Sequence, residues 1–406
     1  MQIQPILSAL KKHKLATFLI AMEIALACAV LVNAVFLIGN RLSAMHINSG
    51  VDEASLGEIV VTGFDPKQVN DLNARMLAGL GAIPGVESVH VISSVPFGRH
   101  GGVAGISLDR AGKHPGPVLQ FYEGDPGTPK ALGLKLVAGH LPAVDDYQPL
   151  QGQDYLPLSS QVLISRALAE QIWPGESPLG KQFWMLKWHF RVVGVVGHLA
   201  VSQYTENGEH GAEWTVFVPT LPGGQLAGTY LIRAESQDLE RVMTKARAAV
   251  AKIAPDVVLD HEDSHTVSFL RERFFATDRA MAGLLVGVIV ALLGVTAFGI
   301  VGLASFWVAQ RRKQIGIRRA LGATRADILR YFQTENFLIV TFGIALGVVL
   351  AVGINLTLMK FFEVPRLPLW YLPVGVVALW LLGQLAVLAP ALRAAAVPPV
   401  VATRSV

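Results

Sequence analysis

The chain of 406 residues is 52% apolar and only 16% charged, with a mean hydropathy of +0.46, whereas soluble domains carry about 25% charged residues. The apolar excess lies in four runs, residues 16–40, 280–309, 337–359 and 369–389, which together hold one charged residue, Glu23. Each run is long enough to cross a bilayer core as a helix, and none alternates like a membrane barrel strand. A wholly soluble protein is therefore excluded.

Residues 41–279 have an ordinary soluble composition, with 20 Lys and Arg against 26 Asp and Glu. The rest of the chain carries 14 Lys and Arg against 4 Asp and Glu, so the net charge of +4 comes from the flanks of the apolar runs. A nucleic-acid-binding protein would carry a basic patch on a folded domain, so we expect no nucleic-acid partner. The single cysteine, Cys28, lies in the first apolar run, which excludes a disulfide from the soluble region.

The distribution of cations predicts the orientation of the chain. Lys11, Lys12 and Lys14 precede the first run, and the link 310–336 carries seven cations. We therefore expect both termini and this link in the cytoplasm and the large domain outside. The first run lacks a cleavage site followed by a polar chain, so we interpret it as an uncleaved anchor. The expected segments are a cytoplasmic N-terminal segment (1–14), a first membrane helix (15–40), an external domain (41–278), a second membrane helix (279–309), a cytoplasmic elbow (310–336), two further membrane helices (337–360 and 369–390) and a cytoplasmic tail (391–406).

Two β-α-β patterns lie near the ends of the external domain. In the first, strand signals at 58–64 and 86–91 enclose a helical pattern. In the second, strand signals at 229–234 and 257–259 do the same. Such a repeat predicts a split, ferredoxin-like sheet with its helices on one face. The two halves are expected at about 53–97 and 228–265.

The region between these halves, 98–227, is rich in Gly and Pro and has short strand signals such as 190–196. Residues 161–172 are predicted as a short helix that ends before Pro174. The predicted fold class is therefore an α-helical membrane protein with four transmembrane helices and a large α+β extracytoplasmic domain. In that domain, a split β-α-β subdomain holds a β-rich insert.

The string Gly-Glu-Ser-Pro-Leu-Gly-Lys-Gln at 175–182 comes close to a phosphate-binding P-loop. Gln182 stands where a P-loop has the Ser or Thr that binds Mg²⁺, and Pro178 lies in the middle of the loop. A predicted helix, not a buried strand, precedes the string. We interpret it as a turn, and we expect no cofactor in this chain.

The string His261-Glu-Asp-Ser-His265 matches the pattern HExxH, in which two histidines on a helix hold zinc and the glutamate acts as a base. Asp263 and Ser264 suit the interior of such a helix poorly, and no histidine follows in the chain. A polar linker is favoured, so we expect neither a metal site nor catalytic residues. A membrane-anchored zinc peptidase that uses His261, Glu262 and His265 is the alternative from a different class.

Glu23 is the only ionisable residue within the apolar runs. Charges inside membranes are costly and often functional. Glu23 is also within about two helical turns of Lys14 and could reach the cytoplasmic interface. An interfacial carboxylate and a role in coupling are equal alternatives.

The link 310–336 contains a pattern that a basic membrane flank does not explain. Apolar side chains alternate with its cations, two glycines interrupt it, and Thr324-x-x-Asp327 forms a capping box that starts a new helix. A short helix, a break and a capped re-entry predict a projecting elbow that suits docking to a soluble partner. A flank held by anionic lipid is the alternative. The residues expected to carry docking are Ile315, Gly316, Ile317, Arg318, Arg319, Leu321, Gly322 and Thr324.

The string Gln-Ile-Gly-Ile-Arg-Arg-Ala-Leu-Gly-Ala-Thr at 314–324 resembles the signature of FtsX-like permeases of the MacB type, which form part of ABC transporters. Residues 271–312 resemble the long second membrane helix of this family, and residues 162–196 resemble its periplasmic core domain. The order of one helix, a large external domain and three helices also fits. Gln314 departs from the family, which usually has Glu at this position.

The resemblance implies a permease subunit of the mechanotransmission class in the inner membrane, which is not itself an enzyme. A separate ATPase dimer, which binds ATP and Mg²⁺, would dock at the elbow and drive export by moving the periplasmic domain. A second permease copy or paralogue would complete the unit, surrounded by membrane lipid. A periplasmic adaptor protein and an outer-membrane channel are further candidate partners. A scaffold or receptor that does not transport is another alternative.

Overall fold

The computed structural model describes residues 14–150, 154–204, 208–362 and 366–398. The chain divides into two compact units. The first, here called the membrane unit, comprises residues 1–43 and 278–406. The second, here called the inserted domain, comprises residues 44–277.

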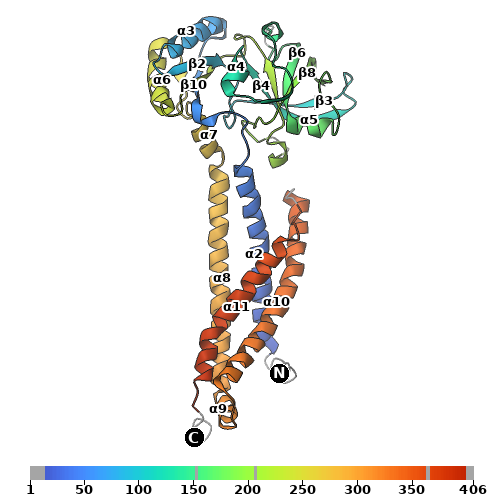
Figure 1. Cartoon of the computed structure of the whole chain (residues 1–406), viewed down its shortest axis with the longest axis vertical. Helices are drawn as coiled ribbons and strands as arrows, with labels where there is room; N and C mark the ends of the chain where they lie inside the picture. The colour runs from blue at the N-terminus through green and yellow to red at the C-terminus, as the bar shows by residue number, and fades with distance from the viewer. Residues whose placement is uncertain (1–13, 151–153, 205–207, 363–365, 399–406) are drawn as a thin grey trace. The chain divides into compact units, whose positions relative to one another are not determined.

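Among the described residues, the membrane unit has four helices that are long and apolar enough to cross a bilayer (Figure 1). They are α2 (Lys14–Met45), α8 (Ala276–Gln310), α10 (Arg325–Phe362) and α11 (Tyr371–Ala395). Each helix extends beyond its own apolar run at one or both ends. The largest extension is in α10, which begins twelve residues before its apolar run because the cap at Thr324 starts the helix there.

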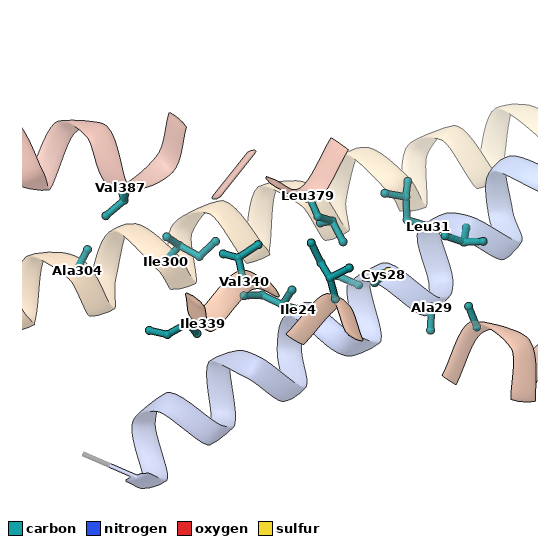
Figure 2. Close-up of a cluster of buried hydrophobic side chains, with 14 of the residues drawn as sticks. Ile24, Cys28, Ala29, Leu31, Ile300, Ala304, Ile339, Val340, Leu379 and Val387 are labelled. Carbon is teal, nitrogen blue, oxygen red and sulfur yellow. The ribbon is translucent and has the colours of Figure 1, made fainter. Parts of the chain in front are cut away.

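The core of the membrane unit joins side chains from all four helices. Figure 2 shows Ile24 and Cys28 of α2 together with Ile300 of α8, Val340 of α10 and Leu379 of α11. Small residues permit close packing of membrane helices. A Cβ atom on Gly347 of α10, for example, would lie 2.4 Å from the Cβ of Cys28.

Buried amide side chains also join the membrane helices. Asn33 of α2 donates from Nδ2 to the carbonyl oxygen of Ala351 in α10, at 3.1 Å. Asn336 of α10 donates from Nδ2 to the carbonyl oxygen of Gly383 in α11, at 2.8 Å. Such interhelical hydrogen bonds satisfy polar groups that lipid cannot, and they fix the register of the helices.

The inserted domain contains a four-stranded antiparallel sheet with the strand order β11-β1-β10-β2. Helices α3 and α6 cover one face, where their apolar side chains pack against Ile59 and Val61 of β1. This arrangement confirms the predicted split sheet with its helices on one face. Its elements are β1 (Leu56–Thr62), η2 (Pro66–Gln68), α3 (Val69–Gly81), β2 (Val86–Val91), β10 (Thr229–Ala234), α6 (Leu239–Ile253) and β11 (Val258–Leu259), with η1 (Glu53–Ser55) before it and α7 (Val267–Phe274) after it.

The second sheet has seven strands in the order β5-β8-β6-β9-β4-β3-β7. Strand β7 pairs with both β3 and β8, so all strands except β5 form a closed barrel. Three phenylalanine rings pack inside it: the ring centroid of Phe190 lies 5.1 Å from that of Phe183 and 5.4 Å from that of Phe121. The predicted β-rich insert is therefore confirmed. Its elements are β3 (Gly102–Ser107), β4 (Pro115–Gly124), α4 (Thr128–Leu132), β5 (Leu136–Gly139), η3 (Val144–Asp146), β6 (Ser159–Ser165), α5 (Arg166–Ile172), β7 (Gln182–Met185), β8 (Trp188–Val196), η4 (Gly208–Gly211) and β9 (Thr215–Pro219).

The prediction of a helix over 161–172 is wrong in its first half. Residues up to Ser165 belong to β6, which lies between β8 and β9 in the barrel. A short apolar run buried in a central strand looks like one turn of a buried helix, since both lack polar positions. The helix α5 begins only after Ser165, whose side-chain oxygen accepts a hydrogen bond from the backbone nitrogen of Leu168 at 3.2 Å.

Candidate functional site

Helix α9 (Arg312–Ala320) connects α8 to α10 and is fixed at its C-terminal end by backbone geometry (Figure 1). Gly322 has a φ of 98°, a conformation that glycine adopts without strain. The backbone nitrogen of Ala323 donates to the carbonyl oxygen of Arg318 at 3.0 Å, and that of Gly322 donates to Arg319 at 3.2 Å. These two bonds form a Schellman motif that ends the helix.

The next helix begins at the capping box that the sequence predicts. The backbone nitrogen of Asp327 donates to Oγ1 of Thr324 at 3.2 Å. In return, the backbone nitrogen of Thr324 donates to Oδ2 of Asp327 at 3.0 Å. The predicted short helix, break and capped re-entry are therefore all present in the described part of the chain.

The inner face of α9 is buried against the chain's own helices. Ile315 is 4% exposed and packs with Ile328 and Phe332 of α10 and with the end of α11. Gly316 is buried beside it. This corrects the expectation that Ile315 and Gly316 face a partner, because their apolar surface is already covered within the subunit.

Two apolar side chains are exposed on the outer side of the elbow, Ile317 in α9 and Leu321 directly after it. Ile317 is 44% exposed and Leu321 is 83% exposed, and their spacing of four residues places them on one side of the helix. Arg312 and Lys313 lie exposed on the same short helix. The surface defined by Ile317 and Leu321 is here called the elbow surface. It consists of two exposed apolar side chains with basic residues nearby.

The two expected rim charges of the elbow have more specific surroundings. The Arg318 guanidinium lies 4.9 Å from the ring centroid of Tyr331, over its face. Arg319 is partly buried, and its Nε has no hydrogen-bond partner among the described residues. Neither arginine is therefore a fully solvated charge.

An ion pair that the sequence analysis missed supports the elbow from inside. Nη1 of Arg311 lies 2.9 Å from both carboxylate oxygens of Glu335, which is 1% exposed. The Arg311 guanidinium also lies 5.4 Å from the ring centroid of Trp307. The one feature of the sequence that could have indicated this ion pair is the position of Glu335, two residues before the apolar run 337–359. Because the partners lie 24 residues apart, this pair fixes α10 to the end of α8.

Glu23 of α2 faces α8 inside the membrane unit. A Cβ atom on Gly299 would lie 2.8 Å from its Oε2 and 3.0 Å from its Oε1, so the glycine makes room for the carboxylate. Oε1 of Glu23 is buried without a hydrogen-bond partner among the described residues. Its role in coupling stays a proposal.

Arginine side chains tie together the chain segments at the boundaries of the two units, a feature that the sequence analysis missed. Within the inserted domain, Arg271 donates from Nη2 to the carbonyl oxygens of Met45 and Ile47 at 2.9 and 2.6 Å. Within the membrane unit, Nη1 of Arg41 lies 2.9 Å from Oδ1 of Asp278 and joins α2 to α8. The only feature of the sequence that could have indicated these contacts is an arginine near each end of the inserted domain, Arg41 and Arg271.

The segment 261–265 is a turn and not a helix. His265 stacks on the ring of Phe269 at 4.0 Å, and Glu262 pairs with Arg99 at 3.1 Å. Burial and nearby arginines lower the pKa of His265. One cluster of potential metal ligands is present among the described residues, and it includes neither His261 nor His265. The helical zinc-peptidase geometry is therefore not formed, and the alternative is not favoured.

The string at 175–182 is a turn between α5 and β7, as expected. Lys181, at the position of the P-loop lysine, pairs with Glu176 and lies 5.6 Å from the ring centroid of Trp173. The backbone nitrogen of Gly180 donates to the carbonyl oxygen of Val192 at 2.8 Å. These groups are therefore engaged in local structure and do not form an open phosphate cradle.

Comparison with known proteins shows what the chain resembles. Residues 286–399 match the family model of the FtsX-like permease C-terminal domain. The chain is 23% identical over 376 residues to the macrolide export ATP-binding/permease protein MacB of Neisseria gonorrhoeae, with 89% of this chain covered. It is also 23% identical over 259 residues to the uncharacterized ABC transporter permease YknZ of Bacillus subtilis, with 62% of this chain covered.

The chain spans only part of these curated relatives, 53% of the Neisseria MacB and 63% of YknZ. Among solved structures, the periplasmic region of MacB from Actinobacillus actinomycetemcomitans matches 57% of this chain and 97% of its own, at 15% identity and a TM-score of 0.36. The family match and the relatives confirm the resemblance found in the sequence. The C-terminal part of the chain is therefore similar to FtsX-like permeases, and the chain as a whole is similar to MacB and YknZ. Its described residues include four helices that are long and apolar enough to cross a membrane.

Proposed function

We propose that this permease couples ATP hydrolysis by a separate ATPase dimer to movement of its extracytoplasmic domain, and that the movement drives export. The elbow surface carries this proposal. Ile317 and Leu321 are apolar and exposed, one on a short helix whose other face is buried and the other at its C-cap. Apolar side chains that project from a rigid support are typical anchors of protein interfaces. ATP and Mg²⁺ would bind to the partner and not to this chain.

A rigid connection from the elbow to the membrane helices supports mechanical coupling. The buried pair of Arg311 and Glu335 joins α8 to α10, and the cluster around Ile315 joins α9 to α10 and α11. A force applied to α9 would therefore act on three helices together. Arg41 and Asp278 then join α8 to α2, which brings in the fourth helix.

The remaining assignments follow from the same proposal. The elbow and both termini lie in the cytoplasm, because the link 310–336 carries seven cations. A second permease, either a copy of this chain or a paralogue, completes the transporter. A periplasmic adaptor and an outer-membrane channel are further candidate partners. The relatives named for macrolide export support an export direction.

Co-purification with the ATPase tests the proposal. We expect Ile317→Asp to release the ATPase from the detergent-solubilised complex, because it places an unpaired carboxylate in the apolar part of the interface. Truncation of one interface anchor costs about 1–2 kcal/mol or more, so binding should weaken at least about fivefold. Arg319→Ala should weaken binding less, and mainly at low salt.

The matched control is Val144→Asp, which introduces the same charge at an exposed apolar position of the inserted domain. It should leave the ATPase bound, and both Asp variants should insert and unfold at the temperature of the wild-type permease. An intact complex with Ile317→Asp contradicts docking at the elbow surface. Loss of binding only with Arg319→Ala favours a flank held by lipid.

A further inference from the structure

A cavity of about 590 Å³ lies at one end of the barrel in the inserted domain. Strand β3 begins there, β4 ends there, and the turn between β7 and β8 borders it. Its opposite wall comes from β1 of the four-stranded sheet and from the segment before β10. Barrel mouths and junctions between subdomains are preferred sites for small ligands, whose pockets measure about 300–1,000 Å³.

Most of the cavity wall is apolar and aromatic. Phe64 and Trp188 line it from opposite subdomains, and Phe121 and Leu156 close it toward the barrel core. The Trp188 indole already donates from Nε1 to the carbonyl oxygen of Leu156 at 2.7 Å. The ring therefore offers its apolar surface to an occupant and needs no further polar partner.

The carboxyl group of Glu123 interrupts this apolar wall. Glu123 lies two residues after Phe121 on the same face of β4, near the open end of the barrel. No side-chain hydrogen bond or ion pair of Glu123 occurs among the described residues. Burial raises its pKa to about 8, because an unpaired carboxylate is costly in apolar surroundings. The other titratable groups that line the cavity are Tyr155 and His100, which contacts Asp263 at 2.9 Å.

The turn between β7 and β8, at the rim of the cavity, contains a leucine in a strained backbone conformation. Leu186 is 89% exposed and has a φ of 52° in the two-residue turn between β7 and β8. Gly, Asn or Asp would adopt this conformation more easily. For leucine the left-handed region costs roughly 1–2 kcal/mol. Strained backbone conformations cluster at functional sites, and this one lies at the mouth of the cavity.

We propose that this cavity binds a small molecule that carries one ammonium group on an apolar body, with the carboxylate of Glu123 as the counter-charge. Phe64 and Trp188 contact the apolar body, and Leu186 covers it at the rim. This ligand site lies wholly within the inserted domain and does not depend on the coupling to ATP hydrolysis. Binding can therefore be measured on the permease alone.

The test uses two fluorescent probes that differ in one charge, dansylcadaverine and its N-acetyl derivative. The full-length permease is placed in phosphatidylcholine nanodiscs, and binding is measured by fluorescence anisotropy against empty nanodiscs. At pH 8 we expect the amine to bind at least about tenfold more tightly than the neutral probe, since a charge-assisted hydrogen bond contributes about 1.5–3 kcal/mol. Between pH 6.5 and 8.5 the affinity for the amine should rise by on the order of tenfold, because Glu123 must be ionised.

Glu123→Gln should lower the affinity for the amine to that for the neutral probe and abolish the pH dependence. It should leave binding of the neutral probe unchanged, which also shows that the cavity is still folded. The matched control Glu170→Gln, at an exposed position of α5, should behave as the wild type. The proposal is overturned if neither probe binds above the empty nanodiscs, if the wild type binds both probes equally, or if Glu123→Gln keeps the preference for the amine.

Discussion

Two buried carboxyl groups, Glu335 in the membrane unit and Glu58 in the inserted domain, have opposite surroundings. In the membrane unit, Glu335 is 1% exposed and both of its oxygens contact Arg311 at 2.9 Å. In the inserted domain, Glu58 is also 1% exposed, but its Oε1 has no hydrogen-bond partner among the described residues, and burial first of all raises its pKa to about 8. Glu123 is partly buried and has a similarly raised pKa.

The comparison separates a carboxylate that stabilises the structure from a carboxyl group that can still titrate or bind a cation. A paired charge in the membrane unit fixes two helices, and breaking such a pair costs more than never forming it. An unpaired carboxyl in the inserted domain is held neutral by burial, so it can respond to pH or to a cation. The first arrangement suits transmission of force, and the second suits binding.

Removal of one partner of the buried pair should have the largest effect. Arg311→Ala leaves the Glu335 carboxylate buried without its counter-charge, and we expect a loss of about 3–5 kcal/mol in stability of the membrane unit. The double variant Arg311→Met with Glu335→Leu should recover most of this loss, because no charge is left unpaired. Thermal unfolding in detergent measures both. Equal stability of Arg311→Ala and the wild type would show that the pair is not structural.

Loss of the arginine that ties the ends of the inserted domain should have the next largest effect. Arg271→Ala removes charge-assisted hydrogen bonds to Met45, Ile47 and Glu53, and we expect a loss of about 2–3 kcal/mol. Arg271→Lys should restore only part of it, since an ammonium group cannot reproduce the planar contacts of guanidinium. Full rescue by lysine, measured as the unfolding temperature, would contradict the proposed geometry.

The raised pKa values of Glu58 and Glu123 predict a fall in stability with rising pH. Because the pKa of Glu58 and of Glu123 is raised to about 8 in the folded state, the unfolded state binds fewer protons between pH ~4.5 and ~8. Stability of the inserted domain should therefore fall by about 1 kcal/mol for each group between pH 6.5 and 7.5. Glu58→Gln should halve this change. A flat pH profile in the wild type would mean that both groups are ionised in the folded protein.

The smallest effects are expected at the two motif look-alikes. Glu262→Gln should change stability by at most about 0.5 kcal/mol, because its pairing with Arg99 is exposed. Lys181→Ala should leave the ATPase activity of the reconstituted complex within about twofold, since this side chain pairs with Glu176 on the surface. Stoichiometric zinc with a peptidase activity that Glu262→Gln abolishes would contradict the first expectation. Nucleotide crosslinking to Lys181 would contradict the second.

The sequence predicts the architecture well because hydrophobic periodicity and caps act locally. The helices around Met76 and Met243, the split sheet and the cap at Thr324 were all accessible from nearby residues. The boundary between β6 and α5 at Ser165 could not be predicted, because a short apolar run is compatible with a buried strand and with a buried helix.

The candidate sites could be predicted only in part, because tertiary packing decides which face of an element stays free. Ile315 and Ile317 look alike in the sequence, yet one is buried against α10 and α11 and the other is exposed. The cavity around Glu123 joins segments more than 100 residues apart. The available signal was a carboxylate that continues the apolar face of Leu119 and Phe121.

The central claim, that the elbow surface receives a cytoplasmic ATPase, is most directly tested by cysteine accessibility. Cys28 is the single cysteine of the chain, so a Cys28→Ala background permits one reporter at a time, Ile317→Cys in the elbow or Val144→Cys in the inserted domain. We predict that a membrane-impermeant maleimide labels Ile317→Cys only from the cytoplasmic side and that the bound ATPase protects it, while Val144→Cys is labelled only from the opposite side. Labelling of Ile317→Cys from outside, or equal labelling with and without the ATPase, would contradict the account.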